Sequence, residues 1–179
     1  MNRYFIAILP PTPIQEYANE IKQHFVDQYA SRGAQNSPPH ITLQPPFLLA
    51  KDQVAILETF LENFAQNQNH LPITLDGFAA FPPRVIYMNV IKNQELLKLQ
   101  SRLVDDIESK LGIKPKGGNN HSFTPHLTVA RRDLKKSDFY IAWDDFKQRQ
   151  VYFEFVAESI TLLLHDGKKW NIKSEFNFQ

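Results

Sequence analysis

Hydrophobic and polar positions divide the chain into strand-like and helix-like segments. Residues 3–9 form an almost continuous apolar run that ends at Pro10-Pro11, which is typical of a buried strand. In the next segment apolar residues recur with a period of 3.6, which predicts a helix with Thr12 as N-cap and Gln15 completing a capping box. The apolar face of this helix contains Ile14, Tyr17, Ala18, Ile21 and Phe25.

Three further helices are predicted by the same helical period. Asp52 is the expected N-cap of the second helix, Gly112 the expected C-terminal stop of the third, and Ser137 the expected N-cap of the fourth. Their apolar faces are Val54, Leu57, Leu61 and Phe64; then Leu96, Leu99, Leu103, Ile107 and Leu111; then Phe139, Ala142, Trp143 and Phe146.

Strands are expected between these helices and at the end of the chain. Asp166-Gly167 is a hairpin signal between the last two strands. The expected strand ranges are 72–79, 84–91, 150–156, 159–165 and 169–176. This order predicts an α+β fold in which two antiparallel sheets face a central cleft and carry helices on their outer faces. We expect residues 1–179 to form one bilobal domain, because no change of composition marks a linker.

One four-residue pattern, His-apolar-Thr-apolar, occurs twice, each time directly after a proline. The copies are Pro39-His40-Ile41-Thr42-Leu43 and Pro125-His126-Leu127-Thr128-Val129. If both are strands, the histidine and threonine of each copy share one face, and the apolar residues point into a core. Composition alone predicts roughly 0.04 such tetrads in this chain. The pair therefore indicates an internal duplication of a functional strand. We expect Pro45-Pro46 to interrupt the first of the two strands.

Histidine and threonine in this arrangement suit the chemistry of phosphate esters. An in-line displacement at phosphorus needs one group that takes a proton and another that gives one, and imidazole does both near neutral pH. Threonine hydroxyls on the same face can donate hydrogen bonds to the nonbridging phosphate oxygens. The sequence does not tell which histidine is the acid and which is the base.

Composition narrows the classes of partner. A net charge of +1 argues against tight binding to duplex DNA but permits a local site for a phosphorylated ligand. The absence of cysteine excludes disulfides and a thiol nucleophile, and it fits a cytoplasmic protein. The apolar run at residues 4–9 is too short to span a membrane. We expect no membrane association and a monomer.

The two tetrads with their flanking segments, Pro38–Phe47 and Thr124–Arg131, resemble those of the 2H phosphoesterase superfamily, and in particular its 2′-5′ RNA ligase-like and cyclic phosphodiesterase members. This resemblance implies a pseudo-twofold fold in which the two motif strands face each other across the cleft. It also implies metal-independent action on a phosphodiester at a ribose 2′ position, often a 2′,3′-cyclic phosphate on a nucleotide or RNA terminus. His40 and His126 would then be the acid-base pair, and Thr42 and Thr128 would hold the phosphate.

Three other residues are candidates for substrate binding. Arg131 follows the second tetrad and could pair with phosphate, although strict alternation places it on the face opposite His126. Arg84 and Tyr87 match a family segment with an arginine and then an aromatic residue, and Tyr87 could stack on a base. Two alternatives to cyclic-ester hydrolysis stay open: a nucleotide-binding module without turnover, and 2′-5′ RNA ligation. Two histidines without a nearby carboxylate form a poor zinc site, so we expect neither a metal nor another cofactor.

Overall fold

The computed structural model describes residues 1–115 and 122–179. Its first sheet has four strands in the order β2-β1-β7-β8, and all neighbouring strands are antiparallel. These strands are β1 (Asn2–Ile8), β2 (Ile41–Leu49), β7 (Ser159–His165) and β8 (Trp170–Asn177). The hairpin predicted at Asp166-Gly167 joins β7 to β8, and Gly167 there has a φ of 100°.

The second sheet also has four antiparallel strands, in the order β5-β4-β3-β6. These are β3 (Leu71–Phe81), β4 (Val85–Val90), β5 (His126–Ala130) and β6 (Tyr152–Ala157). One cluster of buried side chains draws on both sheets, with Ile6 and Leu43 from the first and Leu75 and Leu127 from the second. This shared core favours the prediction that the chain folds as one unit.

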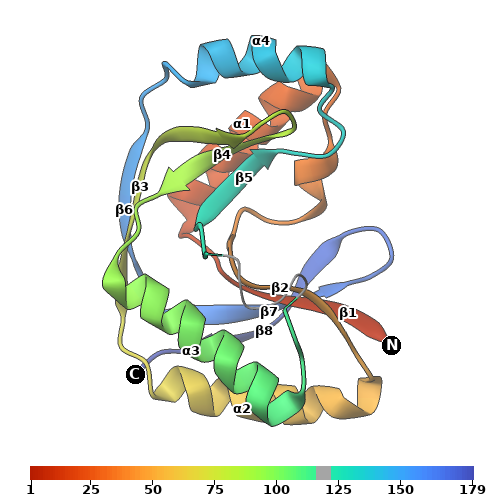
Figure 1. Ribbon diagram of the computed structural model, residues 1–179, viewed down its shortest axis with the longest axis vertical. Coiled ribbons are helices and arrows are strands. Elements are labelled where there is room, and N and C mark those ends of the chain that lie inside the picture. Colours follow the sequence, from red (N-terminus) through yellow and green to blue (C-terminus); the bar gives the residue numbers. More distant parts are fainter. Residues whose placement is uncertain (116–121) are drawn as a thin grey trace.

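Within the described part of the chain, four helices cover the sheets (Figure 1). They are α1 (Thr12–Tyr29), α2 (Val54–Gln66), α3 (Gln94–Leu111) and α4 (Lys136–Phe146). Helix α1 packs against β5, α2 against β8, and α3 against β2 and β3. The α+β class and the two antiparallel sheets predicted from the sequence are therefore confirmed.

Helix ends were predicted less well than helix faces. The N-cap of α1 is Pro11 and Thr12 is already helical, so the predicted capping box is wrong. The reason is that the Gln15 amide donates hydrogen bonds to the carbonyls of Pro10 and Pro39, at 3.2 and 3.0 Å. Asp52 and Ser137 are not caps either, because Asp52 lies in a short 3₁₀ turn (Lys51–Gln53) and Ser137 lies inside α4. Gly112 does end α3, with a φ of 67°.

Strand β2 does not stop at Pro45-Pro46, as the sequence led us to expect, but continues to Leu49. Its position explains this result, because β2 is an edge strand and proline is tolerated where an N–H is not needed by a neighbour. The register of β2 against β1 shifts between Tyr4 and Ile6 and again between Ile6 and Ala7. The first shift falls between Phe47 and Gln44 of β2, so its extra residue accommodates Pro45-Pro46, whereas the second shift falls at Leu43.

Within the described ranges, no helix is long and apolar enough to cross a membrane. A short 3₁₀ turn, Gly33–Asn36, connects α1 to the first tetrad.

Candidate active site

The two tetrads lie at the starts of two edge strands that meet between the sheets: His126 begins β5, and His40 directly precedes β2. Strand β2 is at one edge of the first sheet, β5 is at one edge of the second, and the two strands contact each other (Figure 1). Each tetrad follows the predicted alternation, with half-buried histidine and threonine and fully buried apolar residues. The exposed fractions of those apolar residues are 0% for Ile41, 1% for Leu43, 0% for Leu127 and 0% for Val129.

His40 and His126 are held by the same local hydrogen bond. Each Nδ1 atom lies beside the carbonyl oxygen two residues earlier, at 2.7 Å from Pro38 and 2.8 Å from Thr124. A carbonyl can only accept, so Nδ1 carries the proton in both rings. In the neutral form of each ring Nε2 then has a free lone pair, and in the charged form it has a proton to give. Both motifs thus hold the imidazole through Nδ1 and leave Nε2 available for a ligand.

Aromatic rings support both imidazoles. The His40 ring packs on Phe5 of β1 at a centroid distance of 4.7 Å. The His126 ring packs against Phe81 and Tyr87, each at 5.1 Å. Tyr87 is only 5% exposed, so its ring contacts His126 from the buried side. Burial raises the pKa of the Tyr87 hydroxyl. Phe5 was not among the residues predicted for the site, because a buried strand phenylalanine carries no signal that distinguishes it from ordinary core.

Burial keeps both histidines neutral. Burial is the largest cause that lowers the pKa of His40 from 6.5 to about 4. The hydrogen bond to Pro38 opposes this shift, and the positive charges of Lys22, Arg131 and His126 add to it. Burial also lowers the pKa of His126, again against its backbone hydrogen bond. An anionic ligand between the rings would raise both pKa values, because it favours the charged form of each imidazole.

The two arginines predicted to bind substrate, Arg131 and Arg84, lie in different surroundings. Arg131 is half-buried just beyond β5, and its Nε donates to the Gly33 carbonyl at 3.4 Å. Its charge acts on His40, so the two side chains lie within electrostatic reach. Arg84 is exposed and precedes β4 instead of lying in it. It does not line the cavity that adjoins the two motifs.

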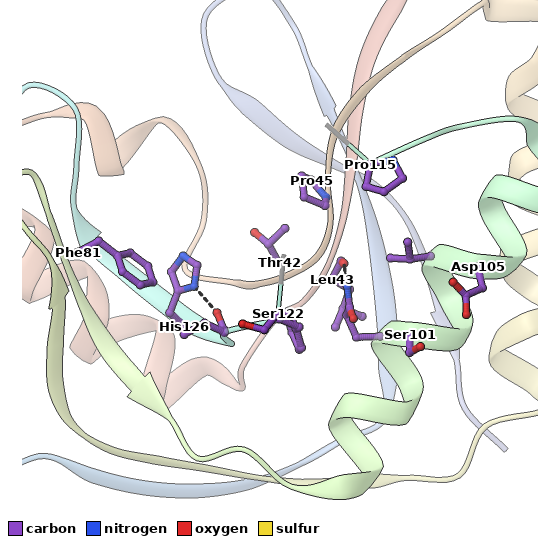
Figure 2. Close-up of a pocket in the computed structure, with 13 residues that line it drawn as sticks. Thr42, Leu43, Pro45, Phe81, Ser101, Asp105, Pro115, Ser122 and His126 are labelled. Carbon is purple, nitrogen blue, oxygen red and sulfur yellow. Dashed lines mark hydrogen bonds between the residues drawn. The ribbon is translucent and has the colours of Figure 1, made fainter. Parts of the chain in front are cut away.

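A cavity of about 480 Å³ begins at the two motifs and extends towards α3. Figure 2 shows His126 and Phe81 on one side and Ser101 and Asp105 of α3 on the other. Its remaining walls come from β2 and from the segments that flank residues 116–121; the lining residues are Thr42, Leu43, Pro45, Phe81, Gln100, Ser101, Val104, Asp105, Pro115, Ser122, Phe123, Thr124 and His126. The α3 residues of this wall were not predicted, because all but Val104 are polar and match an ordinary solvated helix face.

Across residues 1–115 and 122–179, no group of three or more His, Asp or Glu side chains is arranged to hold a metal ion.

Comparison with known proteins assigns this arrangement to a class. The family model described as "2'-5' RNA ligase superfamily" matches residues 10–169, and the chain belongs to this family, whose members are 2H phosphoesterases. A relative from Geobacillus kaustophilus, "Putative phosphoesterase GK0864", is 28% identical over 177 residues, which cover 97% of this chain and 95% of the relative.

Solved structures share the fold. The crystal structure of Escherichia coli LigT in its apo form superimposes with a TM-score of 0.69 at 19% identity, covering 99% of this chain and 98% of LigT. LigT complexed with 3'-AMP gives a TM-score of 0.68 at 20% identity, with the same coverage of 99% and 98%.

Proposed function

We propose that this protein is a phosphodiesterase that opens a 2′,3′-cyclic phosphate on a nucleotide or an RNA terminus, with His40 and His126 as the general acid-base pair and without a metal ion. The observation that carries the proposal is the repeated geometry of the two histidines. Each Nδ1 is tied to the carbonyl two residues earlier, at 2.7 and 2.8 Å, on two edge strands that meet. Two imidazoles held in this way can deliver and remove protons on opposite sides of one phosphorus atom.

The reaction follows from these groups. One imidazole takes a proton from water as the new oxygen–phosphorus bond forms. The bond from phosphorus to a ribose oxygen then breaks, and the other imidazole gives that oxygen its proton. The hydroxyls of Thr42 and Thr128 donate hydrogen bonds to the nonbridging oxygens, where negative charge grows in the transition state. We propose that Arg131 adds positive charge near the phosphate.

The cavity beside the motifs supports a nucleoside substrate. Its volume of about 480 Å³ falls in the range of small-molecule sites, and its wall combines apolar residues with polar groups of α3. LigT, which shares the fold, has been crystallised with 3'-AMP and with phosphate. We assign Tyr87 to the support of His126, and Arg84 to contact with a longer RNA end beyond the cavity.

The test is incubation of the purified, chelator-treated protein with the four 2′,3′-cyclic nucleotides and with a short RNA that carries the same terminus. We expect a nucleoside monophosphate product that depends on both histidines. If no substrate turns over while the protein is folded, hydrolysis of 2′,3′-cyclic phosphates is excluded as its activity.

A binding module is the second candidate, because LigT has also been crystallised with ATP and with NADP+. Saturable binding of 3'-AMP without product over hours would favour it. Joining of two tRNA halves would instead favour ligation. We also propose that the protein acts as a monomer in the cytoplasm, and light scattering measures the first of these properties directly.

A further inference from the structure

The segment that leads into the first tetrad is held by its carbonyl groups. The Ser37 carbonyl accepts a hydrogen bond from Lys22 Nζ at 2.8 Å, and the Pro39 carbonyl accepts one from Gln15 Nε2 at 3.0 Å. Between them, the Pro38 carbonyl accepts from His40 Nδ1 at 2.7 Å. Gln15 and Lys22 are two helical turns apart, so one face of α1 reaches both outer carbonyls.

The second tetrad is held differently. The Thr124 carbonyl accepts from His126 Nδ1 at 2.8 Å, but no side chain of a helix donates to the carbonyls beside it among the hydrogen bonds of the described residues. The two histidines thus have equivalent contacts to their own backbone and unequal contacts to the rest of the fold. The inequality comes from α1.

Lys22 is an unusual residue for this place. Its side chain is 3% exposed, and no carboxylate pairs with it within the part of the chain that the structure describes. Burying an ammonium group without a counter-ion is unfavourable. Burial, and next to it the charge of Arg131, accordingly lower the pKa of Lys22 from 10.5 to about 7. A methionine would fill the same space without this disadvantage.

The charged groups around His40 are all positive when ionised. They are Lys22 of α1, Arg131 beyond β5 and His126 of β5, whereas β1 presents the uncharged Phe5 ring. Neither Lys22 nor Arg131 contributes to the lowered pKa of His126. The buried lysine therefore acts on one of the two imidazoles.

We propose that Lys22 is a positioning residue that acts through His40: it ties the Ser37 carbonyl, and its charge adds to the burial that favours the neutral form of the His40 imidazole, so that His40 is the proton acceptor and His126 the proton donor. This assignment of the two roles rests on the proposed function. In the reaction, His40 Nε2 takes the proton of the attacking water, and His126 Nε2 gives its proton to the leaving ribose oxygen.

Substitutions at two positions distinguish the effect of the Lys22 charge from the effect of the hydrogen bonds that hold residues 37–39. Lys22→Met removes the charge and the hydrogen bond, Lys22→Gln keeps an amide donor without the charge, and Gln15→Met removes the neighbouring tether without changing any charge. NMR titration of the histidine ring signals reads the midpoint of His40 and of His126 in each protein. The acid limb of the kcat/KM profile supplies a second reading.

We expect both Lys22 variants to raise the His40 midpoint by about one pH unit, the shift that a nearby charge typically causes, and to leave His126 in place. The acid limb of kcat/KM should move upward by the same amount, whereas Gln15→Met should lower kcat without moving either midpoint. Should Lys22→Met not fold, Lys22→Gln gives the same reading.

An unchanged His40 midpoint in the Lys22 variants, or an equal shift in Gln15→Met, would overturn the proposal and leave Lys22 as a structural tether. The titration does not need turnover. If the wild type opened no cyclic phosphate and the Lys22 variants still shifted His40, the proposed function would fail while the electrostatic role of Lys22 would stand.

Discussion

At the scale of single residues, two threonines of the first sheet have similar positions in the sheet but different surroundings. Thr42 of β2 pairs across the sheet with Ala7, and Ala7 pairs on its other side with Thr161 of β7. Thr42 lines the cavity, whereas Thr161 is 1% exposed and its hydroxyl oxygen has no hydrogen-bond partner among the residues that the structure describes. The two threonines therefore lie in one row of the sheet and should behave oppositely when the hydroxyl is removed.

We expect Thr42→Val and Thr128→Val each to lower kcat/KM by about 10-fold to 100-fold, because a hydrogen bond to a charged group contributes about 1.5–3 kcal/mol. Thr161→Val is the matched control. It should leave kcat/KM unchanged and raise the free energy of unfolding by about 1 kcal/mol, since it removes a buried polar atom that is not satisfied. Steady-state kinetics and urea unfolding measure both effects, and an equal loss of activity in all three variants would contradict the assignment.

The sequence predicted the burial pattern of the two tetrads better than it predicted their surroundings. His40, Thr42, His126 and Thr128 could be singled out because a period of two places each pair on one face, and their burial follows that alternation. Lys22 and Phe5 could not be singled out. Their roles depend on the contacts of α1 and β1 with a segment far along the chain, and no local pattern reports such contacts.

At the scale of elements, the faces of helices were predictable and their ends were not. The buried residues of α3 are Leu96, Leu99, Leu103 and Ile107, all of them predicted, because burial follows a simple period. Helix caps depend on which hydrogen bonds a side chain forms. The Gln15 side chain bonds to the distant Pro39 carbonyl instead of capping its own helix. The continuation of β2 through Pro45-Pro46 could likewise not be predicted, because the sequence of a strand does not show whether it lies at the edge of its sheet.

The C-terminal ends of α1 and α3 allow a prediction of opposite sign. Both helices end in a left-handed residue, Ala30 with a φ of 53° and Gly112 with a φ of 67°. Alanine in this conformation is less stable than glycine by roughly 1 kcal/mol. Gly112→Ala should therefore lower the free energy of unfolding by about 1 kcal/mol and Ala30→Gly should raise it by about 1 kcal/mol. Chemical denaturation of the two variants checks this pair, and changes of the same sign would refute the argument.

At the scale of the whole molecule, the buried site links stability to pH. His40 titrates near 6.5 in the unfolded chain and at about 4 in the folded protein. Between these values the unfolded state binds more protons, so the free energy of unfolding falls as the pH falls from 6.5 towards 4. This one group accounts for a loss of roughly 3 kcal/mol over that range.

The comparison variant is His40→Gln, which cannot take up the proton. We expect the difference in free energy of unfolding between wild type and variant to change by about 3 kcal/mol between pH 7 and pH 4, in favour of the variant at low pH. Denaturant titrations at several pH values give this difference directly. A difference that stays constant with pH would mean that His40 has an ordinary pKa in the folded protein.

The measurement that tests the central claim most directly follows the oxygen of water into the product. Chelator-treated wild type, His40→Ala, His126→Ala and the double variant are incubated with 2′,3′-cyclic nucleotides in ¹⁸O-labelled water, and the products are analysed by mass spectrometry. We predict a nucleoside monophosphate with one ¹⁸O on phosphorus from the wild type, and a rate lower by at least about 100-fold in each folded variant. Labelled product formed at the wild-type rate by the double variant would contradict the account.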